Sequence, residues 1–294
     1  MMAITASMVK ELRERTGAGM MECKKALVES DGNMDDAVEL LRKSGQAKAD
    51  KKSGRVAADG CIVVATDGRR AAMLEINSET DFVAKDDNFI AFADAVAAAA
   101  LEGGITDAVA ITGATLADGR TVEAARTELV TKVGENISVR RVAQIEGADQ
   151  LASYTHGARI GAVVALEGGD AELARDIAMH VAATNPLCID ESGVAPDILE
   201  RERRIFAEQA AESGKSADII EKMVNGRVAK YLKEITLLGQ PFVKDTEITV
   251  GKLLDKAGAR VTRFVRFEVG EGIEKKQENF AEEVMKQIKD SASA

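Results

Sequence analysis

Aromatic residues, histidine, cysteine and proline are all scarce in this chain of 294 residues. It has no tryptophan, two tyrosines and eight phenylalanines, with only three prolines, three cysteines and two histidines. Cys23, Cys61 and Cys188 lie far apart and form no Cys-x-x-Cys pair, so the sequence predicts neither a disulfide framework nor a zinc knuckle. A reducing cytoplasm is therefore the expected location.

Positive charge is also in deficit. The chain carries 39 Lys and Arg against 49 Asp and Glu, a net charge of −10. This surplus of negative charge opposes binding to nucleic acid phosphates and to anionic lipid surfaces. No apolar run approaches the length of a membrane span, and the first residues contain no apolar signal core. We therefore expect no direct nucleic acid partner and no membrane association.

Motifs of catalytic sites are missing as well. His156 and His180 have no metal-ligand spacing with each other or with cysteine, and a structural or interface role is favoured for both. Neither a Gly-x-Ser-x-Gly nucleophile elbow nor a Gly-x-Gly-x-x-Gly dinucleotide fingerprint occurs. The segment 214–216 reads Gly-Lys-Ser but lacks the earlier glycine of a phosphate-binding loop. The expectation is a protein without a catalytic site, metal or cofactor.

What the chain does contain is typical of a globular protein of about two domains, with 46% hydrophobic residues. The first segment, 1–55, predicts a helical module and a linker. Its periodic runs each end at a glycine, namely Gly17, Gly32 or Gly45, and predict helices over Thr5–Arg15, Met20–Ser30 and Asn33–Ser44. The basic stretch from Lys48 to Arg55 is typical of a solvated, partly helical linker.

Strand patterns dominate the next segment, 56–146. Apolar runs at 61–64 and 72–76 flank Asp67-Gly68, which predicts a β-hairpin. A helical run then extends to Ala100. The strand predicted over 137–145 places four residues on one face: Ile137, Val139, Ala143 and Ile145.

The segment 147–270 repeats this plan more loosely, with a strand over 158–166 and a helix over 173–183. The sequence therefore predicts an α+β fold with two related subdomains containing antiparallel sheets. Two charged amphipathic helices at about 198–233 predict a protruding helical hairpin. A strand over 261–269 places Val265, Phe267 and Val269 on one face, and 271–294 predicts a C-terminal helical module with a helix over 279–289.

Residues Thr80–Val83 form one local oddity, an acid beside an aromatic where a loop enters a helix. Phe82 is a candidate contact residue because aromatics are so few. The alternative is that Phe82 packs the helix entry into the core, and pattern alone favours this alternative because Phe is usually buried.

Several motifs occur together in one order along the chain. They are Ile4-Thr5-Ala6, Val9-Lys10-Glu11-Leu12-Arg13, Thr16-Gly17-Ala18-Gly19-Met20-Met21, Cys23-Lys24-Lys25-Ala26-Leu27, Thr80-Asp81-Phe82-Val83-Ala84-Lys85, Gly134-Glu135-Asn136, His156-Gly157-Ala158-Arg159-Ile160-Gly161, Gln240-Pro241-Phe242-Val243 and Arg266-Phe267-Glu268-Val269-Gly270-Glu271-Gly272. In this set and order the sequence resembles the bacterial elongation factor Ts family, the guanine-nucleotide exchange factors of elongation factor Tu.

The resemblance implies a ubiquitin-associated-like N-terminal module, two related core subdomains, a helical arm and a C-terminal helical module. It implies that Asp81 and Phe82, held by Thr80 and Val83, enter the GTPase domain of elongation factor Tu and help dislodge its Mg²⁺. Further partner contacts are implied for Arg13, Met20, Met21, Val133, Gly134 and His156. Without the resemblance, Met20 and Met21 fit helix-bundle packing equally well.

Two other function classes stay open at this stage. One is a non-catalytic scaffold that docks proteins through its first 45 residues. The other is an enzyme of small-molecule metabolism, which the missing motifs make a distant alternative.

Overall fold

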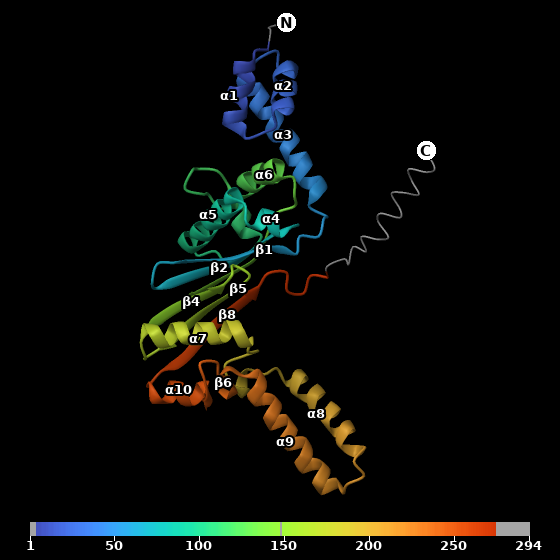
Figure 1. Ribbon diagram of the computed structural model, residues 1–294, viewed down its shortest axis with the longest axis vertical. Coiled ribbons are helices and arrows are strands. Elements are labelled where there is room, and N and C mark those ends of the chain that lie inside the picture. The colour runs from blue at the N-terminus through green and yellow to red at the C-terminus, as the bar shows by residue number, and fades with distance from the viewer. Residues whose placement is uncertain (1–3, 148, 275–294) are drawn as a thin grey trace, which may run out of the picture.

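The computed structural model describes residues 4–147 and 149–274. Within this part of the chain the fold is α+β, with antiparallel sheets and ten α-helices, which confirms the predicted class. Figure 1 shows an elongated molecule with a helical bundle at one end, two sheets with covering helices in the middle and a pair of long helices at the other end. The helix predicted over 279–289 lies outside the described residues.

The N-terminal bundle consists of α1 (Ala6–Thr16), α2 (Met20–Glu29) and the first half of α3 (Met34–Lys52). Polar caps start two of these helices: Thr5 accepts from the Met8 amide, and Asn33 accepts from the Asp35 and Asp36 amides. Apolar side chains of all three helices form one small core. Val28 of α2 does not belong to it, because its side chain is exposed.

The predicted end of the third helix at Gly45 is wrong, because α3 continues to Lys52. Gly45 is buried and lies at the contact with a later helix, α6 (Val122–Val133). A Cβ atom at this position would come within 3.1 Å of Thr131 Oγ1. The glycine therefore permits close packing of two helices instead of ending one.

The first sheet has the order β1-β2-β3, all antiparallel: β1 (Asp59–Thr66), β2 (Arg70–Ser78) and β3 (Ser138–Glu146). The β1–β2 hairpin confirms the prediction from Asp67-Gly68. One face of the sheet packs on α5 (Asp87–Gly103) and α6, and Phe89 and Ile137 are fully buried in this core. The short helix α4 (Asp81–Ala84) joins β2 to α5.

A β-bulge at Arg140 overturns the single face predicted for β3. Arg141 pairs with Glu75 and Val139 pairs with Ile76, which leaves Arg140 as an extra residue. Val139 packs toward the helices, whereas Ile145 packs on the opposite face of the sheet. The bulge shifts the alternation, so the residues before and after it do not share a face.

The second sheet has the order β4-β5-β8: β4 (Gln150–His156), β5 (Ile160–Glu167) and β8 (Arg260–Glu268). Helix α7 (Ala171–Thr184) covers its outer face. Strand β4 was not predicted from the sequence, because it is a half-buried edge strand that contains several polar residues.

The inner faces of the two sheets pack against each other. Ile62 and Met73 of the first sheet meet Val163 of the second. Val265, Phe267 and Val269 also lie in this interface, as the predicted alternation of the last strand requires. Gly161 permits the close approach, because a Cβ there would lie 2.5 Å from Ile62 Cγ2.

A buried carboxylate ties the first sheet to the turn after β8. Glu75 is fully buried and accepts hydrogen bonds from the Gly270 amide (2.8 Å), Asn77 Nδ2 (3.0 Å) and Arg141 Nε (2.5 Å). Burial alone would raise the pKa of Glu75, but the Gly270 amide, Asn77 and Arg141 together hold it below its ordinary value of 4.5. The charged form of Glu75 therefore stabilises the fold.

We expect Glu75→Gln to lower the free energy of unfolding at pH 7 by about 1–3 kcal/mol, because hydrogen bonds to a charged acceptor are lost. A carboxyl whose pKa is depressed by folding contributes stability above its unfolded-state pKa and loses it as the pH falls through the folded-state pKa. The difference between variant and wild type should therefore shrink below about pH 4.5. Urea unfolding at several pH values measures this, and a difference independent of pH would contradict it.

The helical arm consists of α8 (Pro196–Ala211) and α9 (Ala217–Ile235), which extend from the body in Figure 1. Phe206 and Tyr231 meet edge to face, with ring centroids 6.2 Å apart. Three small elements pack at the base of the arm: β6 (Pro241–Phe242), β7 (Asp245–Thr249) and α10 (Val250–Lys256).

Candidate functional site

Phe82 is the most exposed large apolar side chain among the described residues, with 82% of its surface accessible. It lies in α4, a helix of only four residues that Thr80 caps. Val83 and Ala84 pack toward the core, so Phe82 points away from it. Pattern alone favoured a buried role for Phe82, and that interpretation is wrong. The side chain is free for contact with another molecule.

Asp81 lies beside Phe82 on the same exposed turn. Its carboxylate forms an ion pair with Lys85 Nζ at 2.6 Å, one helical turn later. Both side chains are exposed, so water screens this pair and it contributes little to stability. An acid and an aromatic are therefore presented together on the surface.

The loop before α4 contacts the segment that follows α6. Glu135 accepts hydrogen bonds from the backbone and the side chain of Thr80, which places Val133 and Gly134 close to the Phe82 turn. Gly134 ends α6 with a positive φ of 81°, and its carbonyl accepts from Lys52 Nζ. Two of the segments predicted as partner contacts, the Phe82 turn and Val133–Gly134, therefore meet at one edge.

His156 ends β4, and its side chain is exposed, with Nδ1 3.3 Å from Tyr154 Oη. The turn after it reaches the same edge of the molecule, because Arg159 Nη1 lies 3.0 Å from Asp59 Oδ1. Asp59 in turn pairs with Ser78 across the first sheet, directly before the Phe82 loop. The His156 turn and the Phe82 loop therefore lie at one edge.

Arg13, Met20 and Met21 are not part of this edge. All three are exposed, with 58% of Met20 and 75% of Met21 accessible, so the two methionines do not serve as bundle core. They lie on the N-terminal bundle at one end of the molecule (Figure 1). Helix α3, with 19 residues and a length of about 28 Å, joins the bundle to the body.

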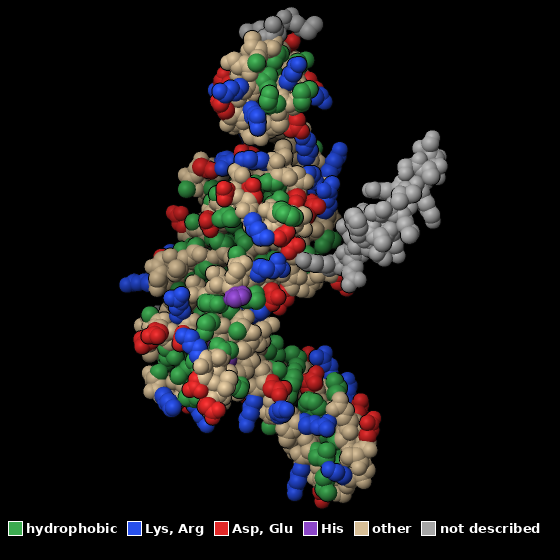
Figure 2. Space-filling model, in the orientation of Figure 1, with side chains coloured by type: hydrophobic (Ala, Val, Ile, Leu, Met, Phe, Trp, Pro, Cys, Tyr) green, Lys and Arg blue, Asp and Glu red, His purple; other side chains and the backbone are tan. Residues whose placement is uncertain are grey.

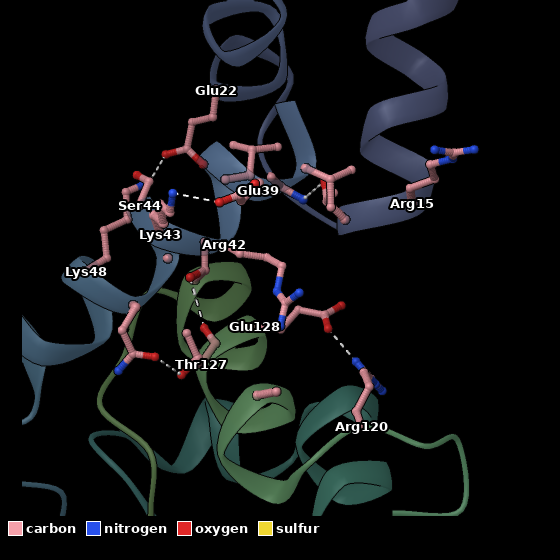
Figure 3. Close-up of a pocket in the computed structure, with 18 of the residues that line it drawn as sticks. Arg15, Glu22, Glu39, Arg42, Lys43, Ser44, Lys48, Arg120, Thr127 and Glu128 are labelled. Atoms are coloured by element: carbon pink, nitrogen blue, oxygen red, sulfur yellow. Dashed lines mark hydrogen bonds and ion pairs between the residues drawn. The ribbon is translucent and has the colours of Figure 1, made fainter. Parts of the chain in front are cut away.

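A separate groove of about 780 Å³ runs between the bundle and α6 (Figure 3). Its charged side chains are largely paired with one another: Lys43 with Glu39, Lys48 with Glu22 and Arg120 with Glu128. These pairs neutralise most of its charge. The groove does not include the Phe82 turn.

The buried histidine and cysteines fit structural roles. His180 is fully buried, with its Nε2 2.9 Å from Gln240 Oε1, and burial lowers its pKa. Burial raises the pKa of the Cys61 thiol to about 12, so the nucleophilic thiolate is disfavoured. Across residues 4–147 and 149–274, no group of three or more His, Cys, Asp or Glu side chains could hold a metal ion.

On the face shown in Figure 2, basic and acidic side chains are interspersed over the bundle, the body and the arm. None of the helices in the described part of the chain is both long and apolar enough to cross a membrane.

Sequence reasoning missed the residues that hold the Phe82 loop in place, above all Glu79 and Glu135. Glu135 occurs in the Gly134-Glu135-Asn136 motif, but no local pattern indicates that its partners are 55 and 56 residues earlier. A glutamate between a helix-ending glycine and a strand is the only signal that the chain offers.

Comparisons with known proteins agree on one family. The sequence model of the family described as Elongation factor TS matches residues 79–271. Elongation factor Ts of Thioalkalivibrio sulfidiphilus is 64% identical over 292 residues, covering 98% of this chain and 99% of the relative. Elongation factor Ts of Methylococcus capsulatus is 59% identical over 293 residues, covering 99% and 100%, respectively. The relative of the same name from Idiomarina loihiensis is 58% identical over 287 residues, covering 98% of each chain.

The matched family region begins at the loop that carries Phe82 and ends in the turn that contacts Glu75. The relatives match almost from end to end. This chain belongs to the elongation factor Ts family.

Proposed function

We propose that the protein is a guanine-nucleotide exchange factor that binds elongation factor Tu in its GDP-bound state and accelerates the release of GDP. The membership of a translation elongation factor family supports this role. The single observation that carries the proposal is the exposure of Phe82 next to Asp81 on an anchored turn. Exposing a large apolar ring to water is unfavourable, so such a residue is suited to a contact with a partner.

The proposed contact surface has two parts. Asp81 and Phe82 would enter the GTPase domain of the partner, with Thr80 and Val83 holding them, and Val133, Gly134 and His156 would line the surface beside them. Arg13, Met20 and Met21 on the bundle would form the second contact, and the exposure of both methionines supports it. Methionine suits such a surface because its side chain is flexible and polarisable.

The proposed mechanism needs no covalent step. A protein that binds the nucleotide-free partner more tightly than the GDP-bound partner must weaken GDP binding by the same factor. The Mg²⁺ of the partner neutralises phosphate charge, so its displacement by the Asp81–Phe82 turn would raise the free energy of the bound GDP. GDP release would then become faster, and GTP could bind in its place. The proposed location is the cytoplasm.

A non-catalytic scaffold that docks through the first 45 residues is the second candidate. The exposed methionines of the bundle fit that function equally well. The Phe82 turn does not, because it lies on the body of the molecule and not on the bundle.

We expect the protein to bind nucleotide-free elongation factor Tu at least about ten-fold more tightly than the GDP complex, as a coupling of this kind requires. Titration calorimetry with the two forms of the partner measures both affinities. Equal affinities would rule out the proposed exchange activity, while a scaffold would still bind both forms.

A further inference from the structure

Glu135 holds the start of the Phe82 turn with three hydrogen bonds. One carboxylate oxygen, Oε2, accepts from the backbone amides of Glu79 (3.1 Å) and Thr80 (3.0 Å). The other, Oε1, accepts from the Thr80 hydroxyl at 2.7 Å. Hydrogen bonds to a charged acceptor are stronger than neutral ones. The carboxylate therefore fixes both the backbone and the side chain of Thr80.

The contact is reciprocal. Glu79 Oε1 accepts from the Asn136 amide at 2.6 Å and lies 3.5 Å from Arg55 Nη1. The Asn136 side chain donates to the carbonyl oxygens of Ser53 and Arg55 at 3.3 and 2.8 Å. The segments 53–55, 79–80 and 135–136 are thus locked to one another. We call this set of contacts the Glu135 clamp.

Helix α4 cannot hold its own orientation. A helix of four residues is far too short to be stable alone. The Thr80 hydroxyl accepts only a long hydrogen bond of 3.4 Å from the Val83 amide, whereas it donates to Glu135 at 2.7 Å. Since Phe82 is exposed, packing of its ring does not fix its direction either. Packing of Val83 and Ala84 on the core turns Phe82 outward, and the remaining constraint on its direction is how firmly the first residue of the turn is held.

We propose that Glu135 is a positioning residue for nucleotide exchange, which acts by fixing the direction in which the Asp81–Phe82 turn meets elongation factor Tu. This inference rests on the proposed function. Glu135 does not need to touch the partner, because it acts through Thr80 on Phe82. A turn that is already rigid loses little conformational entropy when it binds the partner. A flexible turn must lose that entropy on binding, which makes its insertion less favourable.

The test measures the release of a fluorescent GDP analogue from elongation factor Tu at increasing concentrations of the protein. For Glu135→Ala we expect the maximal release rate to fall by about 10- to 100-fold, as expected for a misplaced functional group. The concentration needed for half-maximal release should change much less, since the rest of the contact surface is intact. A purely structural role would lower the amount of folded protein instead, which leaves the rate at saturation unchanged.

Glu135→Gln is the second variant. It keeps the size of the side chain, and its oxygen can still accept from the Glu79 and Thr80 amides, but it removes the negative charge and places an NH₂ group where the Thr80 hydroxyl must accept instead of donate. It should show a smaller loss in the same direction, and this variant provides the test if Glu135→Ala does not fold. Glu128→Ala is the matched control, because it removes an exposed glutamate from the preceding helix, where it pairs with Arg120. Its release rate should equal that of the wild type.

A double-mutant cycle with Phe82→Ala separates positioning from direct contact. If Glu135 acts through Phe82, Glu135→Ala should reduce the rate less than about two-fold in the Phe82→Ala background. Full loss in that background, or wild-type rates for both Glu135 variants, would overturn the proposal. If the wild-type protein itself fails to accelerate GDP release, the proposed function is wrong. The proposed role of Glu135 in exchange then fails with it, and this result is distinct from a loss seen only in the Glu135 variants.

Discussion

Phe82→Ala is expected to slow the stimulated release of GDP from elongation factor Tu by about 30-fold or more, the equivalent of roughly 2 kcal/mol for an aromatic residue at the centre of an interface. The melting temperature of the variant should stay close to that of the wild type. The reason is that 82% of the side chain is exposed, so the contacts that are lost exist only in the complex. Stopped-flow release and thermal melts measure the two effects separately.

Val109→Ala is the matched control for Phe82→Ala. Val109 is also highly exposed, at 78%, but it lies in a different loop. Its removal should change neither the release rate nor the stability. If Phe82 instead packed into the core, its replacement would cost about 3–5 kcal/mol of stability, and exchange would fail only as the fold fails. A destabilised Phe82→Ala with normal exchange per folded molecule is the result that would contradict the account.

The Asp81→Ala variant tests the contribution of the carboxylate to exchange separately from that of the Phe82 ring. A carboxylate at a helix start contributes about 0.3–1 kcal/mol to stability. A large exchange defect in this variant would therefore come from the contact with the partner and not from the fold.

Gly60→Ala is expected to lower the free energy of unfolding by about 3 kcal/mol or more, since it combines a backbone clash with an unfavourable φ. Gly60 has a φ of +133°, which residues with side chains rarely adopt. A Cβ there would overlap the carbonyl oxygen of Ile76 and lie 2.7 Å from the Cα of Asn77. The clash is with backbone atoms of a buried strand, which cannot move aside cheaply.

Gly68→Ala is the control that separates strain from clash. Gly68 also has a positive φ, +87°, but a Cβ there would meet no atom within 4 Å. Its replacement should cost only the strain of the left-handed conformation, about 1–2 kcal/mol. Chemical denaturation of both variants gives the comparison, and equal losses would show that the clash at Gly60 is relieved by a backbone shift.

Local patterns predicted much of the fold. Asp67-Gly68 between two apolar runs correctly indicated the β1–β2 hairpin, since both strands and their turn are neighbours in sequence. The helix starts predicted at Thr5 and Asn33 are correct for the same reason, because each of these residues caps its helix through amides only two or three positions later. The alternation over 261–269 correctly placed Val265, Phe267 and Val269 in one interface.

The failures occur where a distant contact decides the conformation. Gly45 continues its helix because it packs against α6, about 80 residues later in the chain. The bulge at Arg140 is stabilised by the Glu75 carboxylate on the neighbouring strand. The local sequence around Gly45 or Arg140 is the same whether or not such a distant partner exists, so it does not indicate the contact.

At the candidate site, too, local sequence indicated some features, whereas distant contacts decided the others. The Asp81–Phe82 turn stands out in sequence as an acid beside a scarce aromatic, but only its burial could decide between core packing and exposure. The resemblance pointed to the residues of the proposed contact surface. The Glu135 clamp depends on hydrogen bonds between residues more than 50 positions apart, and these become visible only in the folded chain.

One measurement tests the central claim most directly. Elongation factor Tu loaded with a fluorescent GDP analogue is mixed with excess unlabelled GDP and increasing amounts of the wild-type protein, and the loss of fluorescence is followed by stopped flow. We expect the release rate to rise with the concentration of the protein and to reach a plateau far above the intrinsic rate. The plateau is expected because GDP would leave from a complex of this protein, elongation factor Tu and GDP. A release rate that stays at the intrinsic value at every concentration would contradict the proposed exchange activity.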